Sequence, residues 1–206
     1  MNERAQTERH KSIDYTGAKF GMWLFLFTEI LLFGGMFLVY AVYRQVNTAD
    51  FHEAAKEMSL FFGGMNTVVL LTSSLTMALS ISAIKRNAKV RSMALQAVTI
   101  MLGAAFLVNK LIEWQEHILH GYYPDSAVLL AMGHGKILYF GLYYVMTGIH
   151  GLHVLVGAAI ICFTLVQTQR DRITSADYIT LENTGLFWHL VDIIWIYLFP
   201  LFYLIK

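Results

Sequence analysis

Residues 182–195 read E-N-T-G-L-F-W-H-L-V-D-I-I-W, and an apolar run, residues 196–205, follows them directly. Together they are long enough to cross a bilayer as a helix, which takes about 20 residues. His189 and Asp192 stand one helical turn apart on the same face of that helix. An ionisable side chain at this depth costs roughly 2.5–3.5 kcal/mol on insertion scales, so it normally faces the protein interior and has a partner. We therefore predict a membrane span whose two polar groups help to hold neighbouring helices together.

The composition extends this interpretation to the whole chain. Of its 206 residues, 57% are hydrophobic and only 14% are charged, and the mean hydropathy is +0.54. Soluble domains average about 25% charged residues, so this is the composition of a membrane protein. The net charge of +1 gives no sign of nucleic-acid binding. A single cysteine, Cys162, excludes a disulfide framework and a cysteine-based metal site.

The hydropathy pattern predicts an all-α bundle of five membrane helices, because lipid leaves backbone groups no other partners. The spans are expected at about 20–43, 60–84, 93–115, 136–167 and 183–205, within a single membrane domain, 1–206. Residues 1–19 are polar and lack the apolar core of a cleaved signal peptide, so the first span would direct insertion.

The distribution of lysine and arginine predicts the orientation. Ten of these residues fall at the N-terminus and in the second and fourth connections, and four fall on the other side. We therefore expect a cytoplasmic N-terminal tail and an outer C-terminus. The ten are Arg4, Arg9, Lys11, Lys19, Lys85, Arg86, Lys89, Arg91, Arg170 and Arg172, and the four are Arg44, Lys56, Lys136 and Lys206.

Ionisable residues inside the spans are the candidate functional residues. Glu29 lies nine residues into the first span, roughly 13 Å deep. The fourth span carries His150 and His153, which could meet Glu29, His189 and Asp192 in one polar network. Such a network could carry protons or be static. A haem or copper site would need further histidine, methionine or cysteine donors around the two histidines.

A second polar cluster is expected at the outer end of the third span. Lys110 and Glu113 are three residues apart and could pair, with both side chains reaching the outer surface. Glu116 and His117 complete a pattern that loosely resembles a metal site. His150 would lie about 20 Å deeper along its own span, so these groups should not share one metal ion.

Other residues are expected to pack helices together, either as small residues that allow close approach or as polar and aromatic residues between helices. They are Gly34, Gly35, Asn66, Thr67, Gly148, Gly151, Trp188 and Trp195.

Five motifs give the chain a family resemblance. G-M-W-L-F-L-F-T-E at 21–29, N-T at 66–67, E-W-Q-E at 113–116, T-G-I-H-G-L-H-V at 147–154 and W-H-L-V-D-I-I-W at 188–195 follow one another in order. In order and spacing they resemble subunit III of the haem-copper terminal oxidases, in its five-helix bacterial form. One position departs from the pattern: many members carry a carboxylate shortly before the N-T pair, where residues 60–65 read L-F-F-G-G-M.

The resemblance implies a subunit without a cofactor or catalytic residues of its own, in an enzyme complex of aerobic respiration. Haem and copper would reside in partner subunits, which reduce O₂ and pump protons. The chain would contact subunit I, assemble with subunit II and a small subunit IV, bind structural phospholipid and sustain proton uptake. It would lie in the bacterial cytoplasmic membrane, and its intramembrane polar residues would serve packing.

Several alternatives remain open at this level. Cytochrome c is the favoured electron donor, but subunit III of a quinol oxidase and an accessory protein of nitric oxide reductase share these motifs. A proton channel acting alone is motivated by Glu29, Lys110 and Asp192, although no ring of like residues marks a pore. A membrane metalloenzyme is a further alternative. The difference in membrane depth between its candidate ligands, given above, argues against it.

Overall fold

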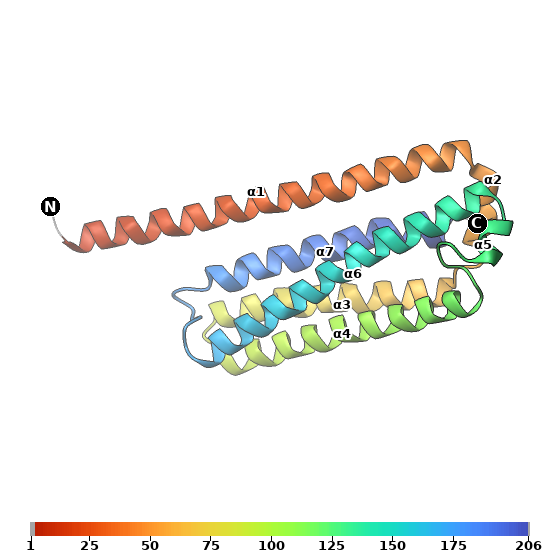
Figure 1. Ribbon diagram of the computed structural model, residues 1–206. Helices are drawn as coiled ribbons and strands as arrows, with labels where there is room; N and C mark the ends of the chain where they lie inside the picture. Colours follow the sequence, from red (N-terminus) through yellow and green to blue (C-terminus); the bar gives the residue numbers. More distant parts are fainter. Residues whose placement is uncertain (1–2, 206) are drawn as a thin grey trace.

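The computed structural model is a bundle of long helices joined by short connections (Figure 1). It describes the backbone of residues 3–205 and the side chains of residues 15–205. Within this part, five helices are long and apolar enough to cross a membrane, which confirms the all-α class and the five spans. The elements are α1 (Glu3–Val46), α2 (Thr48–Ala55), α3 (Leu60–Lys85), α4 (Lys89–Leu119), α5 (Ala127–Ala131), α6 (His134–Gln169) and α7 (Ile179–Tyr203).

The helices run beyond the predicted spans. α1 continues without a break through the polar residues expected to form a tail, and α4 and α6 are longer than 93–115 and 136–167. Hydropathy marks only the apolar part of a helix, whereas the helix continues until the backbone is interrupted. Gly121, just beyond α4, has φ +79°, and Gly133, just before α6, has φ +101°. Glycine adopts such angles without strain. The side chains of Arg4, Arg9, Lys11 and Lys206 lie outside the described residues.

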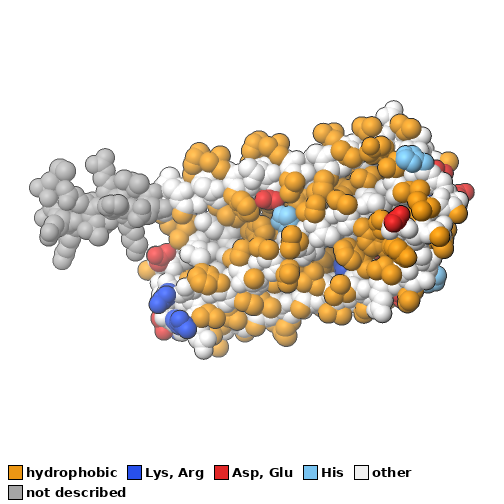
Figure 2. All heavy atoms as spheres, in the orientation of Figure 1, with side chains coloured by type: hydrophobic (Ala, Val, Ile, Leu, Met, Phe, Trp, Pro, Cys, Tyr) orange, Lys and Arg blue, Asp and Glu red, His pale blue; other side chains and the backbone are white. Residues whose placement is uncertain are grey.

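Two short helices were not predicted, and both lie at the same end of the bundle (Figure 1). α2 packs on α6, where the fully buried ring of Phe51 contacts Tyr40 and Tyr139 edge-on, with centroids 5.5 and 5.4 Å away. The Lys136 ammonium on α6 donates to Glu53 at 2.7 Å. This end is called the α2–α5 end below. Figure 2 shows apolar side chains along the bundle and lysine and arginine side chains mainly at the opposite end.

The Glu53–Lys136 pair predicts a pH effect. The hydrogen bond from Lys136 lowers the pKa of the Glu53 carboxyl below its ordinary value of 4.5. A lowered folded-state pKa stabilises the fold above the ordinary value, and that stabilisation is lost as pH falls through the folded value. We expect melting temperature to fall slightly between about pH 5 and pH 3, and less so in Glu53→Gln. Equal declines in both proteins, measured by thermal scans, would contradict this.

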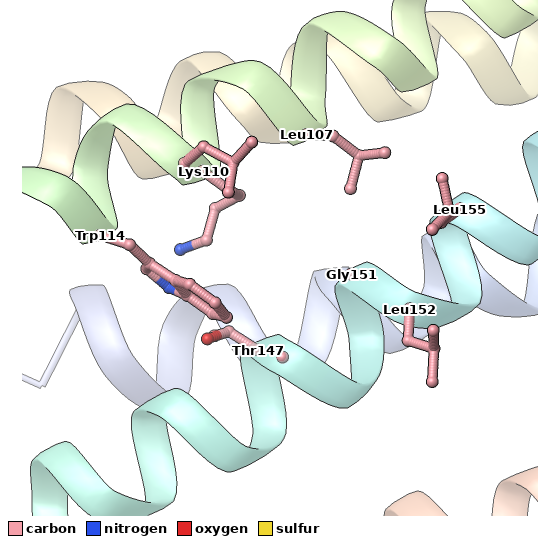
Figure 3. A pocket seen from close by; sticks show the side chains of 9 residues that line it. Leu107, Lys110, Trp114, Thr147, Gly151, Leu152 and Leu155 are labelled. Atoms are coloured by element: carbon pink, nitrogen blue, oxygen red, sulfur yellow. The ribbon is translucent and has the colours of Figure 1, made fainter. Parts of the chain in front are cut away.

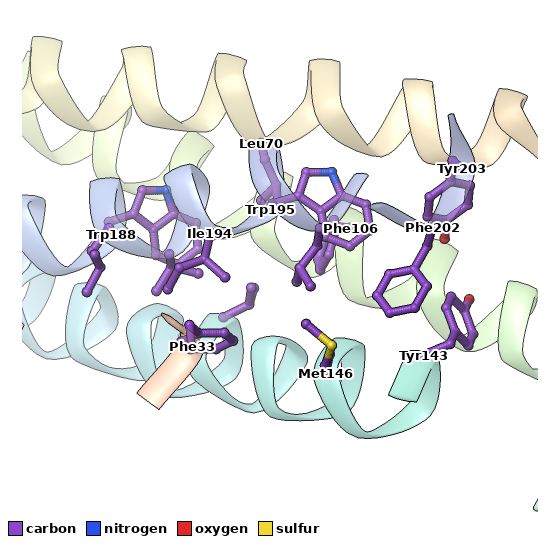
Figure 4. Packing of buried hydrophobic residues seen from close by; sticks show 14 of the residues in the cluster. Phe33, Leu70, Phe106, Tyr143, Met146, Trp188, Ile194, Trp195, Phe202 and Tyr203 are labelled. Atoms are coloured by element: carbon purple, nitrogen blue, oxygen red, sulfur yellow. The ribbon is translucent and has the colours of Figure 1, made fainter. Parts of the chain in front are cut away.

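α7 forms the centre of the bundle and packs on α3, α6 and α1. Its two tryptophans, Trp188 and Trp195, are fully buried (Figure 4). The Trp188 indole donates to Ser73 Oγ at 3.0 Å, and the Trp195 indole donates to Thr67 Oγ1 at 3.0 Å. Both bonds connect α7 to α3, and Phe106 of α4 packs edge-on against Trp195 at 4.9 Å. Trp188, Trp195 and Thr67 therefore lie between helices, as expected.

Glycines mark where helices approach closely, but not at every predicted position. A Cβ on Gly148 of α6 would lie 3.3 Å from Trp114 of α4, and one on Gly151 would lie 3.9 Å from Leu107. A Cβ on Gly34 or Gly35 would meet nothing within 4 Å. Within this chain, α1 packs on α6 and α7 without a close approach at these two glycines, so their packing role stays a prediction.

Candidate functional site

The first candidate site is an ion pair between α1 and α6. The side chains of Glu29 and His153 are mostly buried, and Nε2 of His153 lies 2.9 Å from Glu29 Oε2. The other ring nitrogen, Nδ1, lies 2.7 Å from the carbonyl oxygen of Ile149 and donates to it. The contact between His153 and Glu29 fastens α1 to α6.

The other members of the predicted intramembrane network do not join this pair. His150 is fully buried against Phe106 and Trp195, and within the described residues neither of its ring nitrogens has a hydrogen-bond partner. His189 bonds through Nδ1 to Ser74 Oγ of α3 at 2.6 Å. Asp192 is 3% exposed, and both of its carboxyl oxygens lack a partner in the same part of the chain.

The prediction of one network is therefore corrected to a Glu29–His153 pair and separate groups. The reason is the rotation of α7, which turns His189 toward α3, whereas His153 faces α1. The partner of His189 is Ser74 of α3, a residue that the predicted network did not include.

The second candidate site lies in the half of the bundle nearer the α2–α5 end. The Lys110 ammonium donates to Glu113 Oε2 at 2.9 Å, to Tyr143 Oη at 3.0 Å and to Tyr203 Oη at 2.9 Å. The Tyr203 hydroxyl in turn donates to Glu113 Oε1 at 2.5 Å. All three ammonium protons and both carboxylate oxygens are thus engaged. The centre of the Trp195 ring lies 5.3 Å from the ammonium. We call these four residues and Trp195 the Lys110 cluster.

The predicted pairing of Lys110 with Glu113 is confirmed, but the prediction that they reach the surface was wrong. Lys110 is 6% exposed and Glu113 is 1% exposed. Tyrosine hydroxyls and three aromatic ring faces replace water around the ammonium, so the side chain has no need to extend outward. Glu116 is exposed, and His117 packs on Tyr143 at 5.6 Å without bonding to the pair. Within the described residues, no three histidine, cysteine or acidic side chains converge as metal ligands would.

A third polar cluster, which the sequence did not reveal, lies at the end opposite α2 and α5. Glu182 on α7 accepts from Lys85 of α3 at 2.8 Å, from Lys19 of α1 at 3.0 Å and from Tyr15 of α1 at 3.1 Å. One carboxylate therefore joins three helices. Tyr15 and Lys19 lie on consecutive turns of α1, but Glu182 is more than 160 residues away from Tyr15, so no local pattern connects them.

Two apolar hollows open on the surface of the bundle. One, of about 380 Å³, lies between α4 and α6 and has the stem of Lys110 and the side chain of Thr147 at its wall (Figure 3). Leucines, Trp114 and the Gly148 and Gly151 backbone form the rest of its lining. The other, of about 280 Å³, lies between α1, α6 and α7, near the start of α7.

A sequence profile described as cytochrome c oxidase subunit III matches residues 1–206, the whole chain. The chain belongs to this family. The comparison confirms the resemblance drawn from the five motifs, and it makes the chain a multi-pass membrane protein of a bacterial respiratory oxidase.

Relatives in the subunit III family come from two kinds of oxidase. Cytochrome c oxidase subunit 3 of a Synechocystis species is 33% identical over 187 residues, which are 90% of this chain and 75% of that protein. The subunit of the same name from a Bacillus species is 30% identical over 203 residues, 97% of this chain and 91% of that protein. Cytochrome bo(3) ubiquinol oxidase subunit 3 of Pseudomonas aeruginosa is 31% identical over 185 residues, 90% of this chain and 83% of that protein.

The family places the chain in a multi-subunit assembly. It is subunit III of a haem-copper oxidase, and membership of a terminal oxidase complex implies partner subunits. Identity is near 30% both to relatives named for cytochrome c and to one named for ubiquinol, so similarity does not separate the two electron donors.

Proposed function

We propose that this chain is a cofactor-free accessory subunit that stabilises the catalytic subunit and supports its proton uptake during O₂ reduction, with cytochrome c as the electron donor. The observation that supports the proposal is the Lys110 cluster. Every hydrogen bond of its charged groups is made to a residue inside the bundle. A catalytic or ligand-binding group would keep a position open for the substrate or metal. These groups fix helices to one another instead. The catalytic residues of the complex would all lie in the partner subunits.

The proposed orientation places the N-terminus in the cytoplasm and the C-terminus outside. It is supported by Lys85, Arg86, Lys89, Arg170 and Arg172, which lie at the end opposite α2 and α5. In this orientation, the Glu29–His153 pair lies in the cytoplasmic half of α1, on the side from which an oxidase takes up protons.

In this proposal the chain contacts subunit I directly. Subunit II, a small subunit IV and structural phospholipid are the further components of the complex. The two apolar hollows support lipid binding. Their walls are almost wholly apolar, and a hollow of about 380 Å³ on a membrane surface is of a size to hold part of an acyl chain.

Subunit III of a quinol oxidase is the second candidate, because the chain is 31% identical to the P. aeruginosa protein, close to its identity with the cytochrome c oxidase relatives. An accessory role beside nitric oxide reductase would use the same surfaces. A channel acting alone has less support, because Glu29, Lys110 and Asp192 lie in three separate places and form no continuous path.

The test is a mild purification of the tagged chain from its native membrane, followed by a reduced-minus-oxidised visible spectrum. We expect haem bands and larger subunits to co-purify, and both to be lost when the chain is stripped of its partners. The haem type and the oxidation of added cytochrome c or quinol would then identify the donor. A colourless chain that purifies alone from aerobically grown cells would contradict the proposal.

A further inference from the structure

Residues 15–25 of α1 lie loosely on the outside of the bundle, at the end opposite α2 and α5 (Figure 1). None of their side chains is buried, whereas further along α1 Leu26, Phe33 and Tyr40 are 5%, 1% and 0% exposed. Those three residues are spaced by seven, which places them in one row along a helix that packs on its neighbours. α1 is therefore seated on the bundle from Leu26 onward. We call residues 15–25 the strap.

A hollow lies between the strap and the bundle. The hollow of about 280 Å³ between α1, α6 and α7 has Ala18, Met22 and Phe25 of the strap on its α1 side. Val156 and Ile160 of α6 also line it. Close packing is the main force that holds apolar helices together in lipid, and here a hollow takes its place. The strap therefore needs other contacts to stay against α6 and α7.

The strongest of these contacts converge on one carboxylate of α7. The Lys19 ammonium lies 3.0 Å from Glu182 Oε2, and the Tyr15 hydroxyl donates to the same oxygen at 3.1 Å. The other oxygen, Oε1, accepts from Lys85 of α3 at 2.8 Å. One oxygen of Glu182 thus holds the strap, while the other holds the carboxylate to α3.

The remaining contacts of the strap are weaker. Asn183 Nδ2 donates to the carbonyl oxygen of Ala18 at 3.3 Å, which is long for a hydrogen bond. The ring of Phe25 lies 5.8 Å from that of Phe187, but Phe25 is 44% exposed. Attachment of the strap therefore depends mainly on the bonds to Glu182.

Those bonds can be broken from outside the bundle. The side chain of Lys19 is 41% exposed, and salt screens an ion pair that is open to solvent. Gly17 and Gly21 lie within the strap, and glycine makes a helix easier to distort than alanine would. The strap can thus move without disturbing the seated part of α1.

We propose that the strap is a gate over the hollow, held closed by Glu182. While Lys19 and Tyr15 are bonded to Oε2, the strap lies against α6 and α7 and closes the hollow on its α1 side. When these bonds break, the strap swings away from the bundle about Leu26, and the hollow opens to the surrounding lipid. This inference goes beyond the proposed function and does not depend on the electron donor.

The distance between two spin labels tests the gate, in the full-length chain in lipid nanodiscs. Cys162, the single cysteine of the chain, is exposed on α6 and takes one label. Gly17→Cys takes the other, because a Cβ there would meet nothing within 4 Å. We expect one main distance, and in Glu182→Gln a longer distance whose fraction is raised about fivefold, as the loss of a partly exposed ion pair allows. High salt should act in the same direction.

Two further variants separate the strap's bonds from the rest of the cluster. Lys19→Gln combined with Tyr15→Phe removes both bonds from the strap and keeps the carboxylate, so it should lengthen the distance as Glu182→Gln does. Lys85→Gln is the matched control, since it removes a bond to the same carboxylate from α3. The strap should stay closed in this control.

A second pair of labels reports on the seated part of α1. Leu38 and Val145 are 70% and 54% exposed, and both are labelled as cysteines in a Cys162→Ser background. If this distance lengthens together with the first, α1 moves as a unit and the hinge at Leu26 is wrong. An unchanged distance from position 17 in Glu182→Gln and in high salt, or opening by Lys85→Gln alone, would overturn the gate. None of these outcomes bears on the accessory function, which co-purification with haem decides.

Discussion

Gly157→Leu should prevent the bundle from packing, whereas Gly141→Leu on the same helix should leave it almost unchanged. A Cβ on Gly157 would lie 2.8 Å from Trp188 Cε3 and 3.2 Å from Phe187 Cε1. A Cβ on Gly141 would meet nothing within 4 Å. Extra atoms in a well-packed core typically cost 1–3 kcal/mol. We expect at least about 3 kcal/mol for Gly157→Leu, because the indole cannot move aside.

The indole of Trp188 is confined on three sides. Gly157 of α6 lies against one side, and Gly103 of α4 lies against another, where an added Cβ would be 2.8 Å from Trp188 Cη2. The third constraint is the hydrogen bond to Ser73 Oγ. Three helices therefore meet at one ring. In lipid, where there is no hydrophobic drive between helices, such close packing provides much of the stability.

The measurement is unfolding of the purified chain by increasing the fraction of a denaturing detergent, followed by tryptophan fluorescence. Trp188→Ala introduced beside Gly157→Leu should recover part of the loss, because it removes the ring that the leucine would strike. If Gly157→Leu and Gly141→Leu unfold within about 0.5 kcal/mol of each other, the close contact does not exist as described.

The sequence predicted those features that depend on residues close together along the chain. Five spans follow from runs of apolar residues, and the Lys110–Glu113 pair follows from their spacing of three. The depth of Glu29 and of His153 follows from residue counts, and the structure does bring these two together.

What could not be predicted depends on how far each helix is rotated about its axis. His189 bonds to Ser74, and Lys110 bonds to Tyr143 and Tyr203, across separations of 33 to 115 residues. No local period encodes such contacts, since they depend on which face each helix turns to its neighbours. For the same reason, the sequence could not show that α1 packs on α6 and α7 without a close approach at Gly34 and Gly35.

Lys110→Met and Glu113→Gln should each destabilise the chain strongly. The two losses in free energy of unfolding should not be additive. Removing one partner of a buried ion pair typically costs 3–5 kcal/mol, because the other charge is left without compensation. In Lys110→Met, Glu113 would retain only the Tyr203 hydroxyl, and in Glu113→Gln the ammonium would face a neutral amide. In the double variant no charge remains, and the amide oxygen can still accept from Tyr203.

We therefore expect the double variant to be less destabilised than either single variant, with a coupling free energy of at least about 2 kcal/mol in the detergent-unfolding assay. Lys136→Met is the control, since its partner Glu53 is 62% exposed, and an exposed pair contributes little. Single losses that add within about 0.5 kcal/mol would mean that the two groups do not interact as ions. Strong coupling would show that this charge pair fixes α4 against α6 and α7 inside the bundle.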